Sequence, residues 1–230
     1  MIDFATPEFW LAALEIIFVN ILLSGDNAVV IALACRKLPR RQRVLGIAWG
    51  ALGAIVLRIA ITFFAVRLLE LPYLKLVGGI LLLWIGIKLI ADDAPSGAEA
   101  SVKAHDRLLA AVRTIIVADL VMSLDNVVAV AAAAKGSLAL LVFGLVVSIP
   151  LVIGGAQVFM RIIDRFPLVV IAGGALLGFI AGGLVVDDRV IDPWIEAHAP
   201  WAEWASPLAG IVLVVAAARW LPRRKHRTAK

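Results

Sequence analysis

The sequence predicts an all-α polytopic membrane protein with seven transmembrane helices, arranged as two inverted three-helix repeats plus a C-terminal helix. Three observations lead to this prediction: the apolar composition, the spacing of the apolar segments and an internal duplication. Of the 230 residues, 63% are hydrophobic and 17% are charged, whereas soluble domains average about 45–50% apolar and about 25% charged residues. No soluble core would bury this many apolar side chains, so we expect lipid to surround most of the chain.

Seven apolar segments account for the predicted spans, because a helix needs about 20 residues to cross the hydrocarbon layer. In order they are Phe9–Cys35, Val44–Leu69, Leu74–Ala91, Leu108–Ala134, Leu138–Ile163, Phe166–Val186 and Trp204–Leu221. The first follows Asp3 and Glu8 instead of basic residues and is too long for the core of a signal peptide, so we expect the chain to keep it. Short charged or Pro- and Gly-containing stretches divide the later spans.

Basic residues fall mainly on one predicted side of the membrane. Seventeen of the 22 Lys and Arg residues lie in the stretches Arg36–Arg43, Lys88–Arg113, Arg161–Arg165 and Arg219–Lys230. The positive-inside rule then places the N-terminus outside and the C-terminus in the cytoplasm of a multi-pass protein of the plasma (inner) membrane. The net charge of +5 therefore reports topology. Without a basic groove that carries stacking aromatics, nucleic acid is not an expected partner, whereas membrane lipids are.

Histidine and cysteine are missing from the interior of the predicted spans. Cys35 is the only cysteine, which rules out an intramolecular disulfide, and His105, His198 and His226 lie in predicted loops or the tail. A zinc or copper site built from His and Cys is therefore not expected, and no prosthetic group is indicated.

The chain resembles itself at fixed offsets. An offset of 99 aligns Glu15–Cys35 with Thr114–Ala134, and both stretches contain a Ser-x-Asp-Asn core. An offset of 95 further aligns Pro72 with Pro167, Gly78-Gly79 with Gly173-Gly174, and Asp92-Asp93 with Asp187-Asp188. Within a single transmembrane domain, 1–230, we expect repeat 1 at about 9–93, a linker at about 92–106, repeat 2 at about 107–188 and the extra helix at about 204–221. Three spans per repeat make the second copy enter the membrane in the opposite direction, as in many secondary transporters.

Three aspartates lie within predicted spans, namely Asp26, Asp119 and Asp125. A charged side chain near the bilayer centre costs roughly 2.5–3.5 kcal/mol on insertion scales, so each needs a partner or a polar cavity. On a helical wheel Asn20, Ser24 and Asn27 share one stripe, as do Asp119, Ser123 and Asn126 in the second copy. Such oxygen ligands suit a hard divalent cation. The alternative is a polar pair that only joins two helices by hydrogen bonds.

Each of several other residues near these aspartates allows two interpretations. Glu15 lies on nearly the same helix face as Asp26. It is either an outer ligand or proton acceptor, or a residue that lies in the headgroup region. Arg58 either neutralises a carboxylate when the cation leaves or forms a purely structural ion pair. Met122 offers a thioether to a metal, although packing is the simpler role. Gly25 either lets the backbone open to offer a carbonyl or permits close helix packing.

At these residues the sequence resembles the TerC family of bacterial membrane proteins, in particular its YjbE-like group. The matching stretches are Asn20–Ala34, Trp49–Arg58, Leu74–Leu89 and Ala118–Val127, within a similarity over roughly the first 190 residues. Members of the family are associated with manganese efflux, and some with supplying manganese to exported enzymes. The resemblance implies that Asp26, Asn27, Asp125 and Asn126 lie on the cation pathway; Asp119 fits less firmly, because its repeat partner is Asn20.

We therefore expect a transporter, not an enzyme, that exports a divalent cation by alternating access. The resemblance indicates Mn²⁺, while the ligand chemistry leaves Ca²⁺ and Mg²⁺ open. Expelling two charges against an inside-negative potential costs about 4.6 kcal/mol per 100 mV, which favours proton antiport with Asp119 or Glu15 as the carrier. One rival is a non-transporting membrane partner that helps metallate or assemble exported proteins. The other is an intramembrane aspartyl protease using Asp26 and Asp125, which leaves the Asn after each Asp unexplained. A homo-oligomer is left open.

Overall fold

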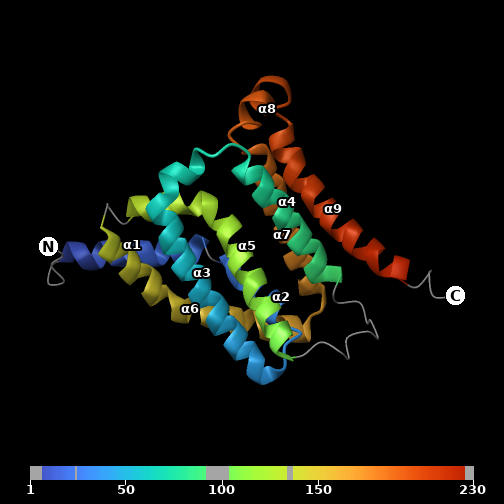
Figure 1. Cartoon of the computed structure of the whole chain (residues 1–230), viewed down its shortest axis with the longest axis horizontal. Coiled ribbons are helices and arrows are strands. Elements are labelled where there is room, and N and C mark those ends of the chain that lie inside the picture. Colours follow the sequence, from blue (N-terminus) through green and yellow to red (C-terminus); the bar gives the residue numbers. More distant parts are fainter. Residues whose placement is uncertain (1–6, 24, 92–103, 134–136, 226–230) are drawn as a thin grey trace. The chain divides into compact units, whose positions relative to one another are not determined.

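A computed structural model describes residues 7–23, 25–91, 104–133 and 137–225 (Figure 1). All regular structure in these ranges is helical, which confirms the predicted all-α class. The helices are α1 (Pro7–Leu23), α2 (Gly25–Cys35), α3 (Arg40–Leu69), α4 (Leu74–Ala91), α5 (Ala104–Ala133), α6 (Leu138–Arg165), α7 (Leu168–Val186), α8 (Asp192–His198) and α9 (Ala202–Lys225). Most of the predicted linker, 92–103, lies outside the described residues.

Five of these helices are long and apolar enough to cross a membrane. The candidate spans are Arg40–Phe64, Leu74–Ala91, Ala139–Arg165, Leu168–Val186 and Ala202–Trp220. They match five of the seven predicted segments. α5 has 30 residues and carries Asp119 and Asp125 near its middle. The total of seven spans stays a prediction.

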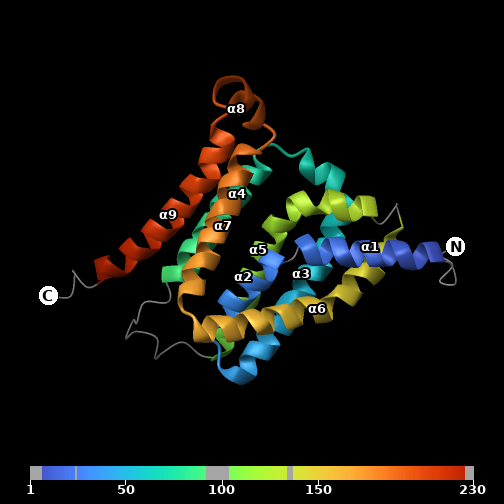
Figure 2. The ribbon, with the colours of Figure 1, turned by 180° about the vertical axis from the view of Figure 1, so that it is seen from behind.

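The expected span Phe9–Cys35 corresponds to two described helices, α1 and α2, whose axes point in different directions (Figure 2). Residue 24 lies outside the described part of the chain, and α2 starts at Gly25. Local chemistry at the start of α2 fits this change of direction, because Gly weakens a helix interior and short polar side chains compete for backbone hydrogen bonds. The Oδ1 of Asp26 accepts such a bond, 2.8 Å long, from the backbone N–H of Asn27. A Cβ added at Gly25 would meet no atom within 4 Å, so close packing does not account for this glycine.

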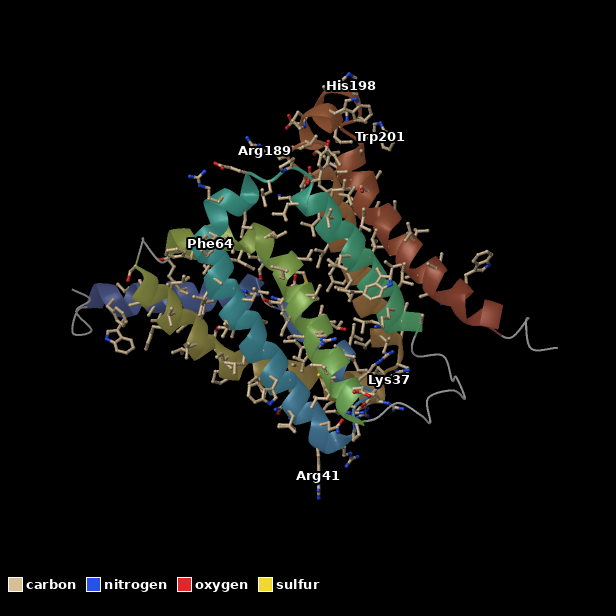
Figure 3. All side chains as sticks on the ribbon, in the orientation of Figure 1. Lys37, Arg41, Phe64, Arg189, His198 and Trp201 are labelled. Atoms are coloured by element: carbon tan, nitrogen blue, oxygen red, sulfur yellow. The ribbon has the colours of Figure 1, made fainter. Side chains whose placement is uncertain are left out.

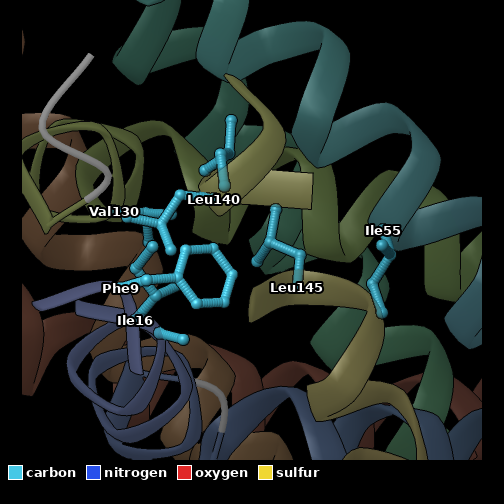
Figure 4. Packing of buried hydrophobic residues seen from close by; sticks show 8 residues of the cluster. Phe9, Ile16, Ile55, Val130, Leu140 and Leu145 are labelled. Atoms are coloured by element: carbon cyan, nitrogen blue, oxygen red, sulfur yellow. The ribbon is translucent and has the colours of Figure 1, made fainter. Parts of the chain in front are cut away.

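The chain forms two compact units, each built from two separate stretches. Unit 1 comprises Met1–Leu68 and Leu108–Arg161 and contains α1, α2 and most of α3, α5 and α6. Its hydrophobic core joins residues from α1, α3, α5 and α6, some of which are shown in Figure 4: Phe9, Ala13, Ile16, Ile55, Val130, Leu140, Leu141 and Leu145.

Helix packing in unit 1 follows a reciprocal pattern. Gly50 on α3 lies against Ile115 on α5, and Gly144 on α6 lies against Ile16 on α1, so closely that a Cβ at either glycine would clash with the isoleucine side chain. Ile16 and Ile115 are equivalent at the offset of 99. The second helix of each half therefore packs on the first helix of the other half.

Unit 2 comprises Leu69–Arg107 and Ile162–Lys230, and in it α4, α7 and α9 lie side by side (Figures 1 and 2). α4 and α7 are antiparallel. A Cβ at Gly79 would meet the carbonyl of Ala181, and one at Gly174 would meet the side chain of Ile90 and approach the carbonyl of Gly86. At the offset of 95, Gly79 corresponds to Gly174 and Gly86 to Ala181, so each helix presents equivalent residues to the other.

Polar contacts stabilise one end of unit 2, where α7 ends and α4 and α9 begin. Asp188 is 1% exposed, and its carboxylate accepts hydrogen bonds from the backbone amides of Tyr73 and Leu76, at 3.3 and 3.2 Å, which caps the start of α4. Figure 3 shows Arg189, His198 and Trp201 at the end of the unit that carries α8, a short helix that the sequence did not predict. Along α7, the Ser206 hydroxyl of α9 donates to the Gly182 carbonyl at 2.8 Å.

Candidate cation site

A narrow crevice lies between α2 and α5 in unit 1. Its lining combines two polar residues, Asn27 and Asp119, with the apolar side chains of Val30, Ile31 and Ile115. In this conformation it is too narrow to admit a water molecule. The polar residues come from equivalent regions of the two repeats, so the crevice joins the two halves of the duplication.

Asn27 is the most unusual residue of the crevice. Its side chain is buried, with the residue 3% exposed. Within the described part of the chain, neither its Oδ1 nor its Nδ2 has a hydrogen-bond partner. An unsatisfied buried polar group costs roughly 1–3 kcal/mol, so proteins retain one where a ligand or a conformational change satisfies it. The free carbonyl oxygen has the chemistry of a hard-cation ligand.

Asp26 stands beside Asn27 in the first turn of α2, half-buried. The positive end of the helix dipole favours a carboxylate at this position. Asp26 also interacts electrostatically with Arg58 and Asp119, residues of α3 and α5. The start of α2 thus combines a helix N-terminus, a carboxylate and an unpartnered side-chain amide in one region of unit 1.

Asp119 lies in a buried hydrogen-bonded network with Arg58 and Ser123. The Nη2 of Arg58 is 2.6 Å from the Oδ1 of Asp119, and its Nε donates to the Ser123 hydroxyl at 3.0 Å. Ser123 in turn donates to the Oδ2 of Asp119 at 3.2 Å. Arg58 and Asp119 are 3% and 8% exposed, so this ion pair is shielded from solvent. The spacing of Asp119 and Ser123 by one helical turn makes their contact possible.

The remaining predicted residues differ in their burial. Met122 is buried with other apolar side chains of α5, Asn126 is half-buried, and Glu15 is exposed on α1. The side chains of Asn20 and Asp125, and all of Ser24, lie outside the described residues. Among the residues that are described, no three His, Cys, Asp or Glu side chains form a metal-binding cluster. The oxygen set that the structure does bring together is therefore Asn27 and Asp119, with Asp26 near by.

Sequence reasoning missed the apolar part of this site. Val30, Ile31 and Ile115 complete the crevice, and nothing in an apolar span distinguishes them from lipid-facing neighbours. Their only signal is helical spacing, since Val30 and Ile31 follow Asn27 by three and four residues and share its face.

Comparison with known proteins agrees with this architecture. The sequence pattern of the TerC family of integral membrane proteins matches residues 5–226. The membrane protein YjbE of Bacillus subtilis is 38% identical over 210 residues, which is 91% of this chain and 94% of that protein. YceF of Bacillus subtilis is 27% identical over 76% of this chain and 70% of its own length. The inner membrane protein YgdQ of Escherichia coli K12 is 25% identical over 71% of this chain and 75% of its own length. No solved structure matches.

The family match covers both copies of the Ser-x-Asp-Asn core and all nine helices of the described chain. The apolar helices, the buried polar network and this nearly full-length match thus lead to one conclusion: the chain is a multi-pass integral membrane protein that belongs to the TerC family.

Proposed function

We propose that this protein exports a divalent metal cation from the cytoplasm and that Asn27, Asp26, Asp119, Asp125 and Asn126 line the path of the ion. The observation that carries the proposal is Asn27, a buried amide without a partner among the described residues, in a crevice that it shares with Asp119. A residue needed only to join helices would have its hydrogen bonds satisfied within the protein.

Charge counting supports a divalent ion. Asp119 is paired with Arg58, so this pair adds no net charge to the region. The two aspartates of the duplicated core, Asp26 and Asp125, then supply two negative charges when ionised. A divalent cation would balance both, which lowers the cost of holding charge inside a membrane.

The ligand types favour a hard cation. Carboxylates and amides bind Mg²⁺, Ca²⁺ and Mn²⁺, whereas thiolates and imidazoles suit zinc and copper. Mn²⁺ is our choice among the hard ions because of the manganese efflux associated with the family. No catalytic role is proposed.

Alternating access of two inverted repeats is the proposed mechanism. The reciprocal contacts support it: Gly50 with Ile115 mirrors Gly144 with Ile16 in unit 1, and α4 and α7 exchange equivalent residues in unit 2. Because the two halves make equivalent contacts, an outward-open arrangement can be exchanged for its repeat-related inward-open arrangement at similar energy. Because export of two charges is opposed by the membrane potential, we propose that protons return as the metal leaves.

Reconstituted protein gives the direct test. Purified chain in proteoliposomes should move Mn²⁺ faster than empty vesicles do, and Zn²⁺ should be a poor substrate. Absence of flux for Mn²⁺, Ca²⁺ and Mg²⁺ would favour the rival function, in which the protein assists metallation of exported proteins without transport.

Two single substitutions connect the flux to the proposed site. Asp26→Asn and Asp125→Asn should each abolish Mn²⁺ transport, because an amide cannot replace the lost charge in a low-dielectric site. Both variants should still fold, since Asn keeps hydrogen bonding and removes a charge from the membrane. Unchanged efflux in both variants would contradict the site, and loss in Asp26→Asn alone would confine the ion to the first repeat.

A further inference from the structure

The buried ion pair occurs in only one half of the duplication. The repeat partner of Asp119 is Asn20. By the reciprocal packing of Gly50 and Gly144, Arg58, eight residues after Gly50, corresponds to Val152, eight residues after Gly144. The packing of α3 on α5 therefore contains a cation and an anion, Arg58 and Asp119. The equivalent positions of α6 and α1 carry neither charge. The duplication supplies Asp26 and Asp125, whereas Arg58 and Asp119 form a separate, charge-neutral addition.

The network engages both carboxylate oxygens of Asp119. Arg58 binds Oδ1 and Ser123 donates to Oδ2, although Asp119 also lines the crevice beside the unpartnered amide of Asn27. An ion that enters the crevice could bind the side-chain oxygen of Asn27 without displacing another group. At Asp119 it would have to displace the guanidinium of Arg58. Arg58 stays charged at any physiological pH, so it leaves Asp119 only when another cation replaces it.

We propose that Arg58 is a tethered cation that occupies Asp119 when no metal is bound and that only a divalent ion displaces. This inference rests on the proposed export function. In the empty carrier Arg58 neutralises the charge of Asp119. The empty carrier can then reorient across the membrane without an unpaired carboxylate in its interior. In the loaded carrier the metal takes over Asp119 and Asn27. A monovalent cation offers no more charge than the guanidinium already there, so Arg58 also determines selectivity for divalent ions.

Competition for Asp119 can be measured as binding. Charge-assisted hydrogen bonds are strong enough that removing the competitor should tighten Mn²⁺ binding about tenfold or more. Arg58→Gln in detergent should therefore bind Mn²⁺ at least about tenfold more tightly than wild type, and Asp119→Asn should bind it more weakly. Unchanged Mn²⁺ affinity in both folded variants would overturn the proposal in favour of a structural ion pair.

Transport modes provide a second readout that a structural role would not separate. Exchange of Mn²⁺ across the membrane needs only the loaded carrier, whereas net efflux needs the empty carrier to return. Arg58→Gln proteoliposomes should keep Mn²⁺ exchange and lose net efflux, while Arg67→Gln, a control on the same helix, should keep both. Equal loss of exchange and net efflux in well-folded Arg58→Gln would overturn the proposal.

If Arg58→Gln does not fold, Arg58→Lys decides the question, because an ammonium keeps the charge but lacks the planar two-point contact with Asp119 and Ser123. We expect tighter Mn²⁺ binding with net efflux retained, and unchanged affinity would again overturn the proposal. Wild-type protein that shows neither exchange nor net flux would overturn the export function, and this inference with it. Wild-type transport beside Arg58 variants that behave like wild type would overturn this inference alone.

Discussion

Replacement of Asn27 by leucine separates a ligand-binding role from a structural one. The two side chains have the same number of non-hydrogen atoms, and in the described part of the chain the side-chain amide of Asn27 has no hydrogen-bond partner to lose. Leucine would therefore remove the burial cost of an unsatisfied amide, roughly 1–3 kcal/mol, without breaking a contact. We expect Asn27→Leu to raise the free energy of unfolding by about this amount and to abolish Mn²⁺ transport.

Ser148→Ala is the matched control. Ser148 is also fully buried, on α6, but its hydroxyl donates to the Leu145 carbonyl at 2.7 Å. Its loss should lower stability by about 1 kcal/mol and leave transport in place. Denaturation in detergent measures both stabilities, and vesicle flux measures both activities. A less stable Asn27→Leu, or one that still exports Mn²⁺, would refute the argument that the amide is kept for an ion.

Three further predictions concern topology, helix packing and coupling. A cysteine at Thr6 should react with an impermeant reagent in intact cells and one at Thr228 should not; the reverse pattern would refute the orientation. Gly210→Ala should lower thermal stability, because its methyl group would collide with the α7 backbone, whereas Gly183→Ala should not, because it meets no atom within 4 Å; equal melting temperatures would contradict this packing. With no imposed potential, Mn²⁺ movement should acidify the compartment that the metal leaves, and unchanged pH would indicate uniport.

Span positions could be predicted from the sequence because lipid imposes one length and one polarity on every crossing helix. α4 has the predicted bounds Leu74–Ala91, and α7 starts two residues after the predicted Phe166. The start of a differently directed helix at Gly25 could not be predicted, since small and polar residues are tolerated inside membrane helices and hydropathy does not register them. The short α8 also escaped prediction, because seven residues are too few for a periodic signal.

The site was predictable as a set of residue types but not as a set of contacts. The sequence places Asp26, Asp119 and Arg58 in spans, yet it does not say which carboxylate receives the guanidinium. That choice depends on packing between α3 and α5, whose paired residues are 61 positions apart. The unpartnered state of Asn27 is likewise a property of its neighbours, so no pattern along the chain reports it.

The two copies of the Ser-x-Asp-Asn core have different backbone settings, and this difference bears on how a carrier of this kind would move. In the first copy, Asp26 and Asn27 lie in the first turn of an 11-residue helix, where the leading amides have no partner within the helix. In the second, Asp125 lies inside α5, a continuous helix of 30 residues. Reorientation of α2 as a unit would keep its own helical hydrogen bonds, whereas a bend at Asp125 would break bonds inside α5. The first copy is therefore the side that we expect to move, with the continuous helix α5 as the fixed reference.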